Sequence, residues 1–389
     1  MNHSQQEFSQ AERLLLDACI VADTRQHSIA SLYAKLTDVV AWEAAQSHEL
    51  EGPVAHRLVS ELGSEKVPAH WHLAHKQTQA RIESFMAEMD RIGARFSDAG
   101  FSCVALKNAG IARAIFSCRG CAPMGDIDLL LGKDDYPRAH QILIEDGYEC
   151  ASRNPTEEAG ITEGRLSGGS EYFREIPEGP TVWVELQWRP VAGRWIRPDQ
   201  EPPVNEMMQR SVAVPGTKIR ILSPEDNLLQ VALHTAKHTY LRAPGLRLHC
   251  DVERIVSGVH IDWSLFLERV KKFRVRTVVY FSLAIPARLF GTPVPEEVLA
   301  ELKPPEWKSR LIWSRLQKAG FFYPARKKFT NLEYMLLGML LYDDMAGVWK
   351  AAFPSSQWMK TRYQISSTVS LPYYYARRWT DLTFRRVGL

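Results

Sequence analysis

The spacing of apolar residues changes twice along the chain, and the first zone has a helical spacing. Apolar residues recur three and four positions apart from Ser9 to about Gly100, which predicts a run of helices. Gly52-Pro53 and Val67-Pro68 interrupt this run. One longer helix is expected to carry an apolar stripe made of Ile82, Phe85, Met89, Ile92 and Phe96. Residues 1–100 are therefore predicted to form an N-terminal helical bundle.

The second zone alternates short strand-like and helical segments. A strand is predicted at 101–106, a helix at 109–116, and a strand at 126–131. Asp134 is expected to cap a helix that Gly147 ends. Further strands are predicted at 148–151, 171–176, 181–188 and 218–222. Residues 101–222 thus predict an α/β core around a small mixed sheet, and the fold class is α+β with flanking helical domains.

Helices return in the third zone, residues 223–389. Ser223 is a good N-cap, Pro224 suits the first helical position, and Glu225 and Asp226 complement the helix dipole. Further helices are predicted at 262–273, 276–289, 296–302, 307–319 and 332–349. The segment 354–389, rich in Tyr, Trp and Arg, predicts no particular structure. This zone is predicted to be a C-terminal helical domain with a basic tail.

The charge distribution makes the third zone a candidate binding surface. The whole chain carries a net charge of +3, but residues 303–389 hold 15 Lys and Arg against 5 Asp and Glu, which leaves −7 elsewhere. Nucleic acid, an anionic membrane surface or an acidic substrate would each suit such a region, and so would plain solvation of helices. No apolar run approaches the roughly 20 residues that cross a bilayer, and no leader pattern is present. A cytoplasmic protein is therefore expected.

The six cysteines are scattered, so no disulfide framework is predicted and a reducing compartment fits best. Cys118 and Cys121 form a single C-x-x-C pair, but no second pair follows at the spacing of a zinc site. The pair is interpreted as small loop residues, with metal binding or redox chemistry as the alternative.

The strongest candidate for chemistry is the acid-x-acid pair Asp126 and Asp128 in the predicted strand 126–131. Residues two apart on a strand point to the same face, so both carboxylates would enter one space. Like charges there are unfavourable unless a cation neutralises them, and Mg²⁺ prefers oxygen ligands. Gly125 leaves room where a triphosphate would approach. The alternative is an ordinary solvated strand face.

A third acid, Glu185, is expected from the strand 181–188. Its face is opposite to that of Val182, Val184, Leu186 and Trp188. Glu185 would complete a metal site with Asp126 and Asp128, and would help to deprotonate an attacking hydroxyl. Two metal ions roughly 3.5–4 Å apart stabilise the attacking and leaving oxygens of an in-line displacement.

A histidine pair in the third zone is a further candidate site. His234 and His238 lie four apart on a predicted helix beside Lys237, and Asp251 follows. The favoured interpretation is a polar seam over the active cleft, with the histidines hydrogen-bonded to Asp251. A zinc site and a substrate contact remain as alternatives. The residues Tyr373, Tyr374, Tyr375, Arg377 and Arg378 suit either an aromatic-basic partner surface or packing of the terminal segment.

Several motifs together resemble a known family. Residues 104–110 read Val-Ala-Leu-Lys-Asn-Ala-Gly, 124–130 read Met-Gly-Asp-Ile-Asp-Leu-Leu, and 184–188 read Val-Glu-Leu-Gln-Trp. With Arg119 and the Asp-Gly-Tyr at 146–148, they resemble uncharacterised bacterial nucleotidyltransferases of the DNA polymerase β-like superfamily. The resemblance implies a polymerase β-like fold and transfer of a nucleoside monophosphate from an NTP such as ATP, with release of pyrophosphate. It also implies Mg²⁺ or Mn²⁺, and an acceptor that is a protein, a peptide, a small molecule or an RNA end.

The same resemblance assigns roles in phosphate binding. The turn 106–110 would receive the triphosphate on backbone N–H groups, with Lys107 contacting phosphate. Asn108 stands where glycine is usual and would provide the positive φ of the turn. Arg119 would neutralise charge that develops during transfer, and a surface salt bridge is its alternative role. Gln187 replaces the usual His. The alternative function is a catalytically weakened protein that keeps the fold as a binding scaffold.

Overall fold

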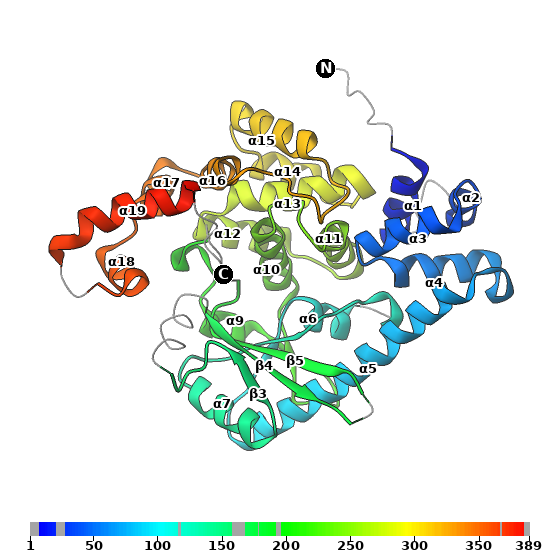
Figure 1. Ribbon diagram of the computed structural model, residues 1–389, viewed down its shortest axis with the longest axis horizontal. Coiled ribbons are helices and arrows are strands. Elements are labelled where there is room, and N and C mark those ends of the chain that lie inside the picture. Colours follow the sequence, from blue (N-terminus) through cyan, green and yellow to red (C-terminus); the bar gives the residue numbers. More distant parts are fainter. Residues whose placement is uncertain are drawn as a thin grey trace.

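The computed structural model describes residues 8–20, 28–115, 118–157, 168–177, 179–191, 196–365 and 368–384. One mixed sheet lies below a mass of helices, and one long helix, α5, runs diagonally beneath both the sheet and the N-terminal helices (Figure 1). The last helices project sideways from the helical mass (Figure 1). The predicted α+β class is confirmed.

Seven strands form the sheet in the order β3-β4-β5-β2-β1-β7-β6. Its centre is the parallel pair β2 and β5, flanked by antiparallel partners on both sides. The strands are β1 (Val104–Ala105), β2 (Ile127–Leu130), β3 (Glu149–Ser152), β4 (Gly169–Glu175), β5 (Thr181–Gln187), β6 (Val212–Ala213) and β7 (Arg220–Ile221). All the predicted strands are present: β1, β2, β5 and β7 are shorter than predicted, β3 is shifted by one residue, β4 starts two residues earlier and ends one earlier, and β6 is an addition.

One face of the sheet is covered by α5 (Ala69–Asp98) and α7 (Tyr136–Glu145). The predicted stripe of α5 is fully buried there against Ile127 and Leu129 of β2. Strand β5 contributes Val182, Val184 and Leu186 to the same core. Because side chains alternate along a strand, this packing turns the residues between them toward the opposite face.

Two local expectations for this zone need correction. Helix α7 begins at Tyr136 after Asp135, and no side chain caps it, so Asp134 is not the cap. Pro137 lies in the first turn, where its missing N–H costs nothing, and this fits the later start. The helix predicted at 109–116 is α6 (Lys107–Ala114), which starts two residues earlier. An unpredicted helix, α9 (Val204–Arg210), precedes β6.

The N-terminal helices are α1 (Gln10–Cys19), α2 (Ile29–Tyr33), α3 (Asp38–Ser47) and α4 (Glu51–Leu62). Short 3₁₀ turns are η1 (Ser64–Lys66), η2 (Arg119–Cys121), η3 (Pro198–Gln200) and η4 (Thr368–Ser370). Ser9 and Glu12 form a capping box on α1, so the first described helix starts with its N–H groups satisfied.

The helices after the sheet follow local capping signals closely. They are α10 (Pro224–Lys237), α11 (Leu246–Gly258), α12 (Trp263–Phe273), α13 (Arg276–Phe290), α14 (Glu296–Leu302), α15 (Glu306–Ala319), α16 (Asn331–Leu340), α17 (Met345–Ala352), α18 (Ser356–Tyr363) and α19 (Leu371–Phe384). Ser223 caps α10 as predicted, accepting from the Asp226 N–H. Helix α11 was not predicted as a helix.

The helix predicted at 332–349 is instead two helices, α16 and α17. Two adjacent aspartates explain the break. Asp343 accepts hydrogen bonds from the backbone N–H groups of Arg276 and Thr277 at 2.8 and 2.7 Å, and so caps α13. Asp344 caps α17 by accepting from the Gly347 N–H at 2.6 Å. Asp344 has the extended backbone of an N-cap, with φ −136° and ψ 166°, so a continuous helix cannot pass through it.

Helices from both ends of the chain share one hydrophobic core. That core contains Leu14 of α1 and Leu58 of α4 together with Leu233 of α10 and Phe281 of α13. The predicted division at residues 100 and 222 therefore does not coincide with separate cores. The predicted domain boundaries at residues 100 and 222 stay a prediction. The first and last predicted domains also include residues 1–7 and 385–389, which lie outside the described ranges.

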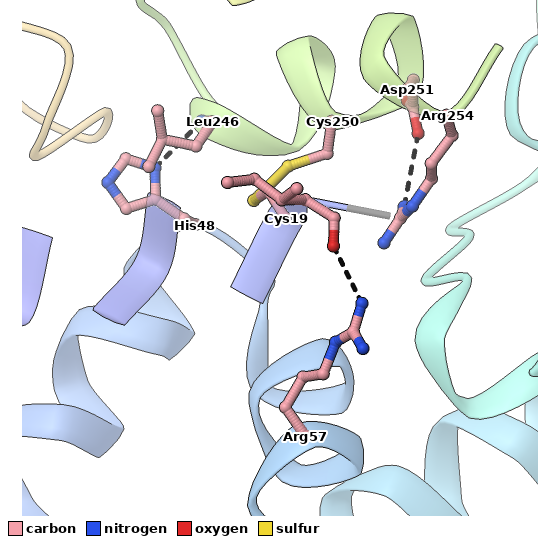
Figure 2. Close-up of a disulfide and its surroundings, with 8 residues drawn as sticks. Cys19, His48, Arg57, Leu246, Cys250, Asp251 and Arg254 are labelled. Carbon is pink, nitrogen blue, oxygen red and sulfur yellow. Dashed lines mark hydrogen bonds and ion pairs between the residues drawn. A yellow bond between two sulfur atoms is a disulfide. The ribbon is translucent and has the colours of Figure 1, made fainter. Parts of the chain in front are cut away.

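A disulfide between Cys19 of α1 and Cys250 of α11 joins the two ends, which the cysteine pattern did not predict. Figure 2 shows the bond between α1 and α11. Close to it, Arg57 donates to the Ile20 carbonyl at 2.8 Å, and the Leu246 N–H donates to His48 at 3.0 Å. Within the described ranges, every helix is too short or too polar to span a bilayer.

A buried charge cluster fastens α5 to the edge of the sheet. Glu88, only 5% exposed, accepts hydrogen bonds from Tyr148 at 2.5 Å, from Arg91 at 2.9 Å and from Arg174 at 3.0 Å. Arg91 also pairs with Asp146 at the end of α7 at 2.6 Å. Burial alone raises the pKa of Glu88, but the bonds from Arg91 and Tyr148 outweigh burial and lower it. The cluster therefore holds an ionised carboxylate.

We expect Glu88→Gln to lower the free energy of unfolding by about 2 kcal/mol at pH 7, because two guanidinium groups lose their buried counter-charge. The folded pKa of Glu88 is below its ordinary value, so its stabilisation is present above that value and is lost as pH falls through the folded pKa. Urea unfolding at pH 7 and in acid measures this difference, which should shrink in acid. Glu83→Gln, on the exposed side of α5, is the control; an equal effect there would contradict the assignment.

Candidate active site

The three predicted acids converge on the sheet face opposite α5. In the parallel pairing of β2 with β5, Asp128 is the direct neighbour of Glu185. Asp126 lies immediately before β2. One carboxylate oxygen from each of the three acids lies within 4.8 Å of the others. Asp128 is buried, whereas Asp126 and Glu185 are partly exposed, so the group opens toward solvent on one side.

Lys107 supplies the nearest positive charge. Its Nζ donates to Asp128 Oδ1 at 2.5 Å and lies 3.4 Å from Glu185 Oε2. Lys107 is the first residue of α6 and has a φ of 47°, so this residue, rather than Asn108, adopts the left-handed conformation of the turn. The expectation that Asn108 provides the positive φ is therefore wrong. The strained backbone of Lys107 aims its side chain back at the acids.

Two further side chains fix the carboxylates. Gln187 donates from Nε2 to Asp128 at 2.9 Å and also to Glu185, while its buried Oε1 has no hydrogen-bond partner among the described residues. Arg153 donates to Glu185 Oε1 at 3.2 Å and pairs with Glu171 at 2.8 Å. Gln187 thus occupies the position of the expected histidine and serves as a donor to two acids. Arg153 was not predicted, since it lies outside the motifs.

The electrostatics of the acids differ. Burial raises the pKa of Asp126, and it raises the pKa of Asp128 well above its usual range despite the nearby Lys107. Burial also raises the pKa of Glu185, but Lys107 and Arg153 outweigh it and lower the pKa to about 2. Burial lowers the pKa of Lys107, yet Asp128 and Glu185 together raise it above its ordinary value. Burial is therefore the main effect that opposes the charged forms of Asp126 and Asp128.

This donor set fits a hard divalent cation. The oxygen atoms come from carboxylates, burial raises the pKa of two of the three acids, and a cation between them would favour their charged forms. Mg²⁺ binds through one or two protein carboxylates and keeps other positions for water and phosphate. A Cβ built on Gly125 would meet no atom within 4 Å, so the approach to Asp126 is open.

The N-terminus of α6 can receive an anion. Leu106, the N-cap, makes no side-chain hydrogen bond to the first N–H groups of the helix. Free N–H groups and the helix dipole favour a negative ligand at such an end. Gly110 lets the helix approach β1, because a Cβ there would lie 2.7 Å from the Ala105 carbonyl oxygen. The predicted phosphate turn therefore lies next to the acids.

Helix α11 covers this turn through Asn108. In the amide orientation that satisfies both neighbours, Asn108 donates to Asp251 Oδ2 and accepts from Arg247 Nη2, both at 3.0 Å. Arg247 also donates to the Pro123 carbonyl at 3.0 Å, and its charge lowers the pKa of Asp126 against the larger effect of burial. Sequence reasoning missed Arg247, although it lies four residues before Asp251 and thus on the same helix face.

The predicted histidine seam lies on α10 near the acids. Burial and the positive charge of Lys107 lower the pKa of His234, and they also lower that of Lys237. His238 bonds to the Ala243 carbonyl at 2.8 Å. Among the described residues, neither histidine bonds to Asp251, so that expected link is wrong. Within the part of the chain that the structure describes, the possible metal-binding groups do not include His234 or His238.

Arg119 and the aromatic-basic tail make mainly structural contacts. Arg119 donates to the Ala112 carbonyl in α6. In the tail, Tyr375 donates to the Pro354 carbonyl at 2.5 Å and Arg378 to the Ala351 carbonyl at 3.1 Å. Arg378 also lies over the Trp358 ring at 4.6 Å. Packing of α19 on its neighbours accounts for these residues; phosphate binding by Arg119 and RNA binding by the tail stay predictions.

Three acids beside a lysine turn on a mixed sheet are the arrangement that the sequence motifs led us to expect, and comparison with known families identifies the class of protein. Residues 39–291 match the family described as uncharacterised nucleotidyltransferase. The chain belongs to this family. The match includes the sheet, the acids, the lysine turn and the covering helices α10 and α11. No curated protein and no solved structure matches the chain significantly.

We expect Lys107→Met to destabilise the metal-free protein by about 3 kcal/mol near pH 7, because removing one partner leaves buried carboxylates uncompensated. Glu185 has a lowered pKa, so the stabilisation by its pairing is present above its ordinary pKa and is lost as pH falls toward about 2. Urea unfolding with a chelator from pH 7 to pH 3 should show the gap to the parent narrowing in acid. Lys133→Met, at an exposed position, is the control; a pH-independent gap would contradict the pairing.

Proposed function

We propose that this chain is a metal-dependent nucleotidyltransferase that moves a nucleoside monophosphate from an NTP to an acceptor hydroxyl and releases pyrophosphate. The main support for this proposal is that Asp126, Asp128 and Glu185 converge beside the uncapped N-terminus of α6. Family membership supports nucleotidyl transfer as the reaction class. In the reaction the acceptor oxygen forms a bond to the α-phosphorus of the NTP. The bond between the α-phosphorus and the oxygen that bridges to the β-phosphorus breaks, pyrophosphate leaves, and the acceptor proton passes to a base.

The side chains divide this work. We assign Asp126 and Asp128 to bind the cation with Glu185; a bound Mg²⁺ or Mn²⁺ would stabilise negative charge on the attacking and leaving oxygens. Glu185, with a pKa of about 2, stays ionised and suits a ligand better than a proton acceptor. Its expected part in deprotonating the acceptor stays a prediction.

The triphosphate is assigned to the turn at α6. The backbone N–H groups at the start of α6 would donate to phosphate oxygens. Lys107 would add a positive charge for the phosphate once a metal ion replaces it as the partner of the acids. Gly125 keeps the approach open. Arg247 and Lys237, on the covering helices, are further cations near the acids. The acceptor, whether a protein, a peptide, a small molecule or an RNA end, would enter on the exposed side of Asp126.

We expect Asp126→Asn and Asp128→Asn each to reduce nucleotidyl transfer at least about 100-fold, since preorganised charge at such sites contributes effects of this size. Incubation of the protein with labelled NTPs, Mg²⁺ and a cell lysate identifies transfer by the label that an acceptor retains. Asp134→Asn, an exposed acid in the following loop, is the matched control and should behave as the parent.

Calorimetry with the four NTPs and Mg²⁺ separates the enzyme from a binding scaffold. Binding that the two aspartate variants lose supports the proposal. Silence for every NTP, or unchanged transfer by both variants, would reject it in favour of a protein that keeps only the fold.

A further inference from the structure

A second ligand cluster lies outside the carboxylate site, where the C-x-x-C segment meets two helices. His56 of α4, His75 of α5, and Cys118 and Cys121 of the η2 segment each offer one ligand atom, and these atoms all lie within 4.8 Å of one another. Nε2 of His75 is 3.1 Å from Sγ of Cys118, and Nδ1 of His56 is 3.6 Å from the same sulfur. Neither cysteine is in a disulfide.

These separations are close to those of a tetrahedral site: the 3.1 Å between His75 and Cys118 is slightly short, and all four ligand atoms lie within 4.8 Å of one another. Zinc binds thiolate at about 2.3 Å and imidazole at about 2.0–2.1 Å, so its ligand atoms stand roughly 3.3–3.8 Å apart at the corners of a tetrahedron. Two sulfur and two nitrogen donors are softer than the carboxylates of the other site, and this mixture selects Zn²⁺ over Mg²⁺. All four donors come from protein, which is typical of a structural site without an open position.

The backbone around the cluster is packed too closely for the arrangement to be accidental surface proximity. A Cβ built on Gly120, between the cysteines, would lie 2.4 Å from Nε2 of His75. A Cβ on Gly52 of α4 would lie 2.0 Å from the Gly120 carbonyl oxygen. Cys121 is buried with its sulfur 3.9 Å from the Gly52 carbonyl oxygen. The absence of side chains at these two positions lets the segment reach both helices.

We propose that His56, His75, Cys118 and Cys121 bind one Zn²⁺ that fastens the segment before Asp126 to helices α4 and α5. Each thiol loses its proton on binding, and both imidazoles bind in neutral form. Only four residues separate Cys121 from Asp126, so the zinc site fixes one end of the loop that carries a catalytic acid. The site is distinct from the carboxylate group in its residues and in its donor chemistry.

Metal analysis of the purified full-length chain, prepared without chelator, tests the proposal. We expect about one zinc ion per chain in the parent, and its loss in the double variant Cys118→Ser, Cys121→Ser. Cys150→Ser and His72→Gln are the matched controls, since Cys150 lies on β3 and His72 lies one turn from His75 on α5 without joining the cluster. Both controls should keep zinc. Asp128→Asn should keep it too, which separates this result from the fate of the proposed transferase activity.

A second measurement does not depend on the variants folding. After zinc is removed from the parent with a chelator, Co²⁺ should produce the intense thiolate-to-cobalt absorption and the visible bands of a tetrahedral site, and zinc should restore the melting temperature. A parent that lacks zinc and gives no such absorption overturns the proposal. Zinc retained by the double cysteine variant also overturns it. So does a Cys118–Cys121 disulfide mapped in the parent as purified, with an intact mass two units below that of the same protein with both thiols free.

Discussion

The structure depends on placing three carboxylates side by side on a buried sheet face. Asp128 and Glu185 are direct cross-strand neighbours, an arrangement that repulsion would disfavour in an ordinary sheet. Lys107, Gln187 and Arg153 surround the pair with donors. The hydrophobic packing of β2 and β5 against α5 and α7 holds the strands in this register, so the apolar face supplies the free energy that keeps like charges together.

The helices around the sheet bring distant parts of the chain to this site. Helices from both ends share one core and a disulfide. Helix α11 reaches the phosphate turn through Asp251 and Arg247, which hold the Asn108 amide. In α10, burial and the charge of Lys107 lower the pKa of His234 and of Lys237. The acids and the nearby cations therefore influence one another's charge. A substitution of Asp251 or Arg247 in α11 would remove a contact to Asn108 in the phosphate turn.

Two ligand clusters with different chemistry lie on either side of one short segment. Hard carboxylate oxygens follow it at Asp126, and soft sulfur and nitrogen donors precede it at Cys118 and Cys121. A hard cation exchanges readily among water, carboxylate and phosphate, whereas a tetrahedral sulfur and nitrogen site holds its ion as part of the fold. Under the two proposals above, this difference would separate a cation that takes part in chemistry from one that fixes the position of the chain.

The sequence determined the local features, because they depend on neighbouring residues. Alternation in 181–188 set the face of Glu185, Ser223 set the start of α10, and the motifs identified the family. It failed where a residue's partner is distant. The predicted helix 332–349 breaks at Asp343, whose side chain binds the distant N-terminus of α13, and the local cap Asp344 then starts α17. Lys107 rather than Asn108 has the positive φ, and its side chain pairs with acids of two other strands. Cys118 and Cys121 were interpreted as loop residues, with metal binding or redox chemistry as the alternative, because the histidines beside them lie on α4 and α5 and meet them only in the tertiary structure.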